Sequence, residues 1–188
     1  MTGNDCLACA ECDRCALGVL LRKSDDFRPV PAELNKSETL VVLPFPSRRD
    51  ESGDQRAPGT GPEGAETLEA LQAVGLRRKN VSWTTVVACR YPKGRKKEFD
   101  AKLRRTNRQR KRKGEDILLM PELCCRPRLE RELQAHQNFL ALGTHAAKAI
   151  LPGAPNLKDV RGAPIFLKNG KRVLATEDPN KIARQPKW

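Results

Sequence analysis

The chain has 188 residues, of which 38% are hydrophobic and 31% charged, with a formal net charge of +13 at pH 7. This length suits one domain spanning 1–188. No apolar run approaches the roughly 18 residues that a membrane-spanning helix needs, so no membrane association is expected. The odd cysteine count, a lysine-rich composition and no secretory signal predict a reducing intracellular location, cytoplasmic or nucleoid-associated.

In chain order, the first feature is a cysteine-rich segment, 1–23. It holds four cysteines at x2 spacing: Cys6, Cys9, Cys12 and Cys15. Cys89 follows a β-type run, and the pair Cys124–Cys125 begins an amphipathic pattern. Thiolates at x2 spacing can face one metal centre, and two distant cysteines can complete a four-sulfur shell. The pattern therefore predicts an iron–sulfur or zinc site.

Four short apolar runs predict buried strands: Leu40–Phe45, Val81–Ala88, Asn138–Gly143 and Val173–Thr176. Because these runs are almost continuously apolar, they are typical of a parallel sheet covered on both faces. A hairpin is expected from Pro164 to Leu174, with Asn169-Gly170 forming a type I′ turn.

Helical patterns lie between these runs. They cover Gly64–Leu76, Pro121–His136 and a short stretch from an N-cap at Thr144 to Leu151. The segment Glu51–Glu63 is rich in glycine, proline and charge, so a loop is expected there. Strands that alternate with helices predict a three-layer α/β/α domain with a central four-stranded, mostly parallel sheet.

The positive charge is concentrated between Arg90 and Lys113, a segment that contains thirteen lysines and arginines and two acidic residues. Such a block releases counterions on meeting a polyphosphate, which favours a nucleic-acid partner, DNA first. Segment 93–116 is predicted to be a basic loop, disordered or weakly helical when free, that contacts phosphates more than bases. A solvated charged surface and an acidic protein partner are the alternatives. The candidate binding residues are Arg95, Lys96, Lys97, Arg104, Arg105, Arg108, Arg110, Lys111, Arg112 and Lys113.

Five motifs in one order resemble those of the iron–sulfur uracil-DNA glycosylases. They are Cys12-Asp-Arg-Cys15-Ala-Leu17 with Arg22, Thr85-Val-Val-Ala-Cys89-Arg-Tyr-Pro92, Glu122–Leu133, Phe139–Ala147 and Val160-Arg-Gly162. The resemblance implies that superfamily's fold and a [4Fe–4S] cluster held by Cys12, Cys15, Cys89 and Cys125. It favours Cys125 over Cys124. A cluster on the N-terminal run alone and a zinc site stay open as alternatives.

The same resemblance places the active-site motifs, and here the chain departs from the family. The family's first strand ends in Gly-Glu-x-Pro-Gly, where this chain reads Leu43-Pro44-Phe45-Pro46-Ser47. The aromatic residue that sandwiches uracil is replaced by Gly59, although Phe45 could still stack a base. The base-reading asparagine is replaced by Thr85, which cannot present both an acceptor and a donor. The family's His-Pro-Ser is replaced by Asp178-Pro179-Asn180, whose carboxylate would repel a developing anion.

These departures predict a domain without uracil excision and without catalytic residues at Leu43, Pro44 or Asp178. The expected function is nucleic-acid binding by a cluster-stabilised domain in DNA replication, repair or modification, with protein partners in such a complex. Two alternatives are kept. One is an active glycosylase for uracil or another modified base that uses the Pro44–Gly61 loop differently. The other is an interaction module for an acidic partner.

Overall fold

The computed structural model describes residues 13–21, 29–51, 56–91, 96–151, 153 and 156–182. Within these ranges five strands form one sheet in the order β2-β1-β3-β5-β4. The strands are β1 (Thr39–Leu43), β2 (Ser82–Thr85), β3 (Asn138–Leu142), β4 (Pro164–Phe166) and β5 (Arg172–Thr176). All pairings are parallel except that of β4 with β5. The predicted mostly parallel sheet is confirmed, with the first arm of the hairpin as its fifth strand.

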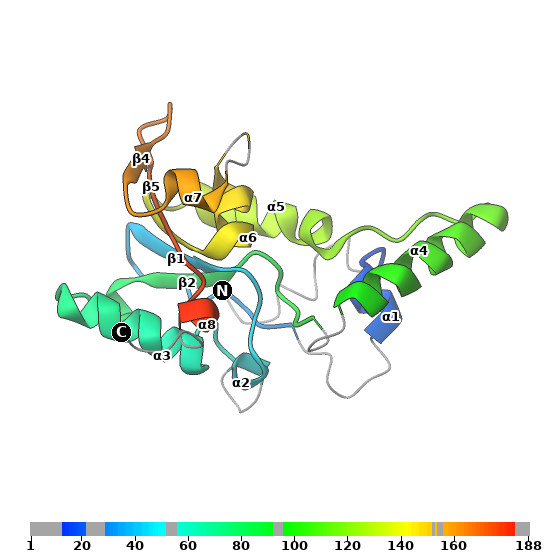
Figure 1. Ribbon diagram of the computed structural model, residues 1–188, viewed down its shortest axis with the longest axis horizontal. Helices are drawn as coiled ribbons and strands as arrows, with labels where there is room; N and C mark the ends of the chain where they lie inside the picture. The colour runs from blue at the N-terminus through cyan, green and yellow to red at the C-terminus, as the bar shows by residue number, and fades with distance from the viewer. Residues whose placement is uncertain are drawn as a thin grey trace.

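Helices cover both faces of the sheet, which confirms the predicted α/β class. The helices are α1 (Ala16–Leu21), α2 (Arg48–Glu51), α3 (Pro62–Ala73), α4 (Lys96–Arg112), α5 (Pro121–Gln134), α6 (Gly143–Ile150), α7 (Leu157–Val160) and α8 (Pro179–Ile182). Figure 1 shows α3 and α8 on one side of the sheet, α5, α6 and α7 on the other, and α4 extending away from the body. In the described part of the chain, no helix is long and apolar enough to cross a membrane.

Successive side chains of β1 point into two separate core clusters. Leu40 and Val42 belong to the larger cluster, which reaches α5 and α6. Val41 and Leu43 belong to the smaller one, which contains the fully buried Trp83 and reaches α3. A continuously apolar strand is therefore needed here, because both of its faces are removed from water.

A buried ion pair joins α5 to the end of β2. Arg128 Nη1 donates to Glu132 at 2.7 Å and to the Thr84 hydroxyl at 2.8 Å, and that hydroxyl donates to Glu132 at 2.6 Å. The second terminal nitrogen of Arg128 donates to the carbonyl of Thr85. Arg128, Glu132 and Thr84 are all nearly inaccessible to solvent. The guanidinium thus satisfies both a carboxylate and backbone acceptors that burial would otherwise leave without partners.

Several local predictions differ from the structure. The strand predicted for Val81–Ala88 is shorter, since β2 ends at Thr85 and the next residues continue as buried bends. The hairpin turn is not type I′. Gly170 donates to the Leu167 carbonyl and has φ of 80°, so Lys168 and Asn169 form the turn and the glycine follows in the left-handed region. The N-cap of α6 is Leu142, not Thr144.

The basic segment expected as a loop contains the 17-residue helix α4 instead. Lysine, arginine and glutamine are good helix formers. Phe99 and Leu103, four residues apart, are 3% and 5% exposed, so they give the helix one apolar side. That side packs in the larger core cluster with Leu118. The helix therefore forms because two apolar residues fasten an otherwise polar segment.

Arg128→Ala is expected to destabilise the fold by about 3–5 kcal/mol, because it leaves the buried Glu132 carboxylate without its cation. Urea unfolding followed by circular dichroism measures the change. Arg126→Ala is the matched control on the same helix, since Arg126 pairs with Glu130 at a side chain that is 46% exposed. Its cost should stay below about 1 kcal/mol. Equal costs for the two variants would contradict this account of the ion pair.

Candidate functional site

The carboxyl ends of β1, β2, β3 and β5 meet at one edge of the sheet, where ligands bind in open α/β folds. Phe45 follows β1, Tyr91 lies downstream of β2, His145 follows β3 and Asp178 follows β5. The chain order therefore brings to this edge residues from four of the segments that the sequence analysis identified, Leu43–Ser47, Thr85–Pro92, Phe139–Ala147 and Asp178–Asn180.

Aromatic rings connect this edge to α4. The ring centroids of Phe45 and Tyr91 lie 4.8 Å apart, and those of Tyr91 and Phe99 lie 5.5 Å apart, both edge to face. His145 contacts Phe45 at 5.1 Å. The Tyr91 hydroxyl donates to Glu122 at 3.1 Å, and burial together with that carboxylate raises the pKa of Tyr91. Phe45 is half-buried in this cluster, so its ring already has aromatic neighbours.

The positions that would read a base or position water are closed. Thr85 is 1% exposed, and its hydroxyl has no hydrogen-bond partner among the described residues. Leu43 is 2% exposed and belongs to the smaller core cluster, and Pro44 is also buried. None of these three side chains reaches a solvent-filled space in which a nucleobase could lie.

Gly59 is held against the core by its surroundings. Its φ is 69°, and a Cβ added there would lie 2.9 Å from the ring of Trp83. Arg78 fixes the same turn, since it donates to the carbonyls of Pro58 and Gly59 at 2.6 and 3.0 Å. Arg78 also pairs with Glu33 at 2.6 Å. A side chain at position 59 would therefore meet both backbone strain and a fixed indole ring.

Asp178 lies at the start of α6. A Cβ added to Gly143, the first residue of that helix, would lie 3.0 Å from the Asp178 Cβ. A helix N-terminus favours negative charge, so the carboxylate has a structural reason to be there. The structure therefore places a carboxylate at this edge of the sheet, beside the first residue of α6.

Two carboxylates of the β1–α3 connection, Asp50 and Glu51, are buried, which the sequence analysis did not predict. Asp50 accepts from the backbone amides of Ser47, Thr60 and Gly61 at 2.8, 2.7 and 3.2 Å, so it fixes both ends of the loop. Glu51 pairs with Arg90 at 2.6 Å. Their nearest sequence signal is the position of Asp50 three residues after Ser47, a local capping arrangement.

Cysteines from three parts of the chain belong to the larger core cluster. The backbone of Cys15 pairs with that of Leu119 in an isolated parallel β-bridge. The Leu119 carbonyl accepts from the backbone N–H of Ala16 at 3.0 Å, and the Leu119 N–H donates to the carbonyl of Arg14 at 2.8 Å. This pairing brings Cys15 to the first turn of α5. Cys15, Cys89 and Cys124 are buried in one cluster, and Cys125 is half-buried against it.

The surroundings of Cys15 suit a thiolate. A hydrogen bond from the Cys124 thiol, supported by the backbone amides of Leu17 and Gly18, lowers the pKa of Cys15 to about 6 against the opposing effect of burial. Metal ligation by cysteine requires the thiolate, so this donor set fits a cluster or zinc ligand. Among the described residues, no three His, Cys, Asp or Glu side chains converge as a complete metal-binding group. The expected ligand Cys12 lies outside those residues.

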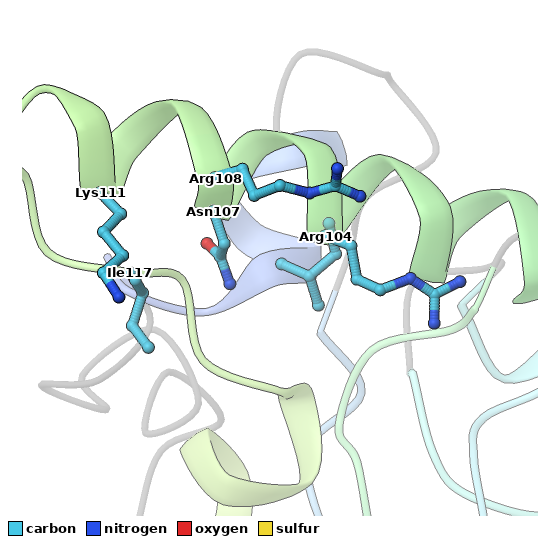
Figure 2. Close-up of a pocket in the computed structure, with 6 residues that line it drawn as sticks. Arg104, Asn107, Arg108, Lys111 and Ile117 are labelled. Carbon is cyan, nitrogen blue, oxygen red and sulfur yellow. The ribbon is translucent and has the colours of Figure 1, made fainter.

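The basic residues of α4 surround its apolar side. The side chain of Asn107 clamps the helix to the following segment through two hydrogen bonds with the backbone of Leu118. Its Nδ2 donates to the Leu118 carbonyl at 2.9 Å, and its Oδ1 accepts from the Leu118 N–H at 2.8 Å. Arg110 pairs with Glu115 at 3.3 Å and donates to the Asp116 carbonyl at 2.5 Å, so it is engaged internally. Figure 2 shows Arg104 and Arg108 extending along the side of α4.

The other predicted phosphate-binding residues divide into two groups. Six are exposed and have no carboxylate partner in the part of the chain that the structure describes: Arg104, Arg105, Arg108, Lys111, Arg112 and Lys113. Lys102, which the prediction did not include, shares these properties. Arg95 and the side chains of Lys96 and Lys97 lie outside the described structure.

The family model of the uracil DNA glycosylase superfamily matches residues 35–188. The match covers most of the chain and the whole sheet, so the chain belongs to this superfamily. It begins after the four N-terminal cysteines, so the iron–sulfur branch within the superfamily stays a prediction. No curated protein matched the chain in a sequence search.

Proposed function

We propose that the chain is a nucleic-acid-binding domain of the uracil-DNA glycosylase superfamily that has lost uracil excision and is stabilised by a [4Fe–4S] cluster. Its place is inside the cell, in DNA replication, repair or modification. The observation that carries the proposal is α4, a helix that exposes a row of lysines and arginines and uses its apolar side to attach to the domain. DNA offers the dense negative charge that such a surface attracts.

The outward part of α4 is the best placed for phosphates. Lys102, Arg105 and Arg112 lie on one side of the helix, are exposed, and have no ion-pair partner among the described residues. They keep their full charge available to a ligand. Since no aromatic side chain lies among them, contacts to the backbone should dominate over base readout.

The loss of excision is supported at four separate places. Thr85, Leu43 and Pro44 are buried, and Gly59 is packed against Trp83. Asp178 adds negative charge where a leaving uracil anion would need stabilisation. Each position also has a structural role in this fold, so a single substitution would not recover the family's site.

The cluster would be held by Cys12, Cys15, Cys89 and Cys125, as in the family that the motifs resemble. When bound, it would supply a covalent link between elements distant in sequence. Cys89 precedes α4 and Cys125 follows it. Ligation of both would therefore fix the two ends of the basic segment at one place, with the N-terminal segment joined to them.

We expect DNA binding with little sequence preference. The dependence of the logarithm of the affinity on the logarithm of the salt concentration should correspond to on the order of 4–8 neutralised phosphates. Fluorescence anisotropy with labelled single-stranded and duplex oligonucleotides at several salt concentrations measures it. Lys102→Gln/Arg105→Gln/Arg112→Gln should weaken binding about tenfold or more and reduce the slope by about 3. The control with the same loss of charge is Lys36→Gln/Lys79→Gln/Lys158→Gln, three exposed lysines elsewhere. Equal affinity for the two variants would place the DNA surface outside α4.

Uracil release from single-stranded or duplex DNA should be at background, because the base-reading and anion-stabilising positions are closed or reversed in charge. Cleavage at abasic sites measures release, with hypoxanthine and hydroxymethyluracil substrates alongside. Thr85→Asn with Asp178→His should give at most weak activity, since Leu43 and Gly59 are unchanged. Robust excision by the unmodified protein, abolished by a change in the Pro44–Gly61 loop, would show that the chain is an active glycosylase.

The cluster predicts iron and acid-labile sulfide in equal amounts, with visible absorbance after anaerobic purification. Cys12→Ala, Cys15→Ala, Cys89→Ala and Cys125→Ala should each remove the absorbance and destabilise the fold. Cys6→Ala and Cys124→Ala are controls that should keep the absorbance. Loss with Cys6→Ala and Cys9→Ala, but not with Cys89→Ala, would favour the N-terminal run as a separate site. Zinc without iron would favour the zinc alternative.

A further inference from the structure

A shallow groove of about 320 Å³ runs along α4 on the side away from Lys102 and Arg105. It lies between the helix and the segment that follows it, and its lining residues are Leu103, Arg104, Asn107, Arg108, Lys111 and Ile117. In Figure 2, Lys111 and Ile117 project toward the same space, with Asn107 between α4 and that segment. The groove is small enough for one or two side chains of a partner, not for a large cofactor.

The floor of the groove is aliphatic. Leu103 is 5% exposed at its base, and Ile117 is 48% exposed at its side. Two more exposed apolar side chains, Met120 and Leu123, follow within six residues of Ile117 along the chain. Of the described residues that line the groove, Leu103 and Ile117 are the apolar ones, and an exposed apolar side chain beside a groove is typical of a protein-binding surface.

The rim of the groove is cationic. Arg104, Arg108 and Lys111 are spaced i, i+4 and i+7, so they form one stripe along the helix. All three are exposed, and none has a carboxylate partner within the described ranges. The stripe lies about 100° around the helix from Lys102, Arg105 and Arg112. The two stripes therefore offer two separate surfaces.

A nucleobase would find little to recognise in this groove. No aromatic side chain is among the described residues that line it, so these residues offer no ring for stacking. The side-chain amide of Asn107 is already bonded to the backbone of Leu118. An aliphatic side chain flanked by carboxylates matches both the floor and the rim.

We propose that this groove binds an acidic, amphipathic helical segment of a partner protein. One aliphatic side chain of the partner packs between Leu103 and Ile117, and carboxylates on the same face pair with Arg104, Arg108 and Lys111. This interaction uses the groove stripe and goes beyond the proposed DNA binding, which uses the outward stripe.

The test uses the full chain and a labelled synthetic peptide of about 14 residues with glutamates at i, i+4 and i+7 and leucine at i+3. A scrambled peptide of the same composition keeps the charge and loses the shared face. Anisotropy measures the affinity of both. The patterned peptide should bind about tenfold more tightly, because only it can place the leucine and the carboxylates together.

Three variants separate the groove from general charge. Arg104→Gln/Arg108→Gln/Lys111→Gln should weaken peptide binding about tenfold, while Lys102→Gln/Arg105→Gln/Arg112→Gln, with the same loss of charge, should change it by less than about threefold. Ile117→Ser, at an exposed position, should weaken peptide binding and leave DNA affinity unchanged. Thermal unfolding by circular dichroism establishes that each variant is folded.

Several outcomes would overturn the proposal. They are equal binding of the scrambled peptide, equal losses from the two triple variants, and no effect of Ile117→Ser. Loss of DNA affinity specific to the groove variant, with no peptide bound, would assign the groove to nucleic acid instead. Failure of DNA binding with selective peptide binding would reject the proposed function and leave this inference standing.

Discussion

The buried contacts of the Arg128 guanidinium fix the position of α5 relative to the carboxyl end of β2. It joins α5, the helix that carries Cys124 and Cys125, to the carboxyl end of β2, from which the chain runs to Cys89. Thr84 and Glu132 complete the contact, because they supply a hydroxyl acceptor and a carboxylate of opposite charge to the guanidinium. Together with the hydrogen bond from Tyr91 to Glu122, this buried contact fixes the register of α5 against β2 and the residues that follow it. The relative positions of the cysteines and of Tyr91 depend on that register.

Gly59 and the described residues around it are part of the packing of this domain. Gly59 allows the turn to lie directly on Trp83, and a Cβ on Gly64 would come within 1.8 Å of the Gly59 carbonyl. The carboxylate of Asp50 binds the backbone amides at both ends of the same loop. The described parts of this loop are therefore held by hydrogen bonds and by contact with the core.

Much of the fold could be predicted from the sequence, because the strands are apolar runs such as Leu40–Leu43 and Asn138–Leu142. The helix α4 could not be predicted. Among the described residues, the buried apolar side chains of α4 are Phe99 and Leu103, and Leu118, which packs with them, lies fifteen residues after Leu103. The burial of Asp50 and Glu51 was also invisible, because their charges are compensated by backbone amides and by Arg90, contacts that only the tertiary structure creates. At the site, the assignment of the changed motifs stays a prediction, and the sequence could not show that Thr85 is buried or that Gly59 packs against Trp83.

The clamp between Asn107 and Leu118 has a consequence for how this domain can evolve. The Asn107 side-chain amide bonds the backbone of residue 118, so this part of the attachment of α4 is independent of the side chain at that position. The packing of Phe99 and Leu103 with Leu118 and the contacts of Arg110 with Glu115 and Asp116 complete the attachment. The remaining surface of α4 is then free to drift, and lineages could exchange its charged residues for others while the domain keeps its shape. A helix attached in this way can change its exposed residues faster than the residues that hold it to the domain.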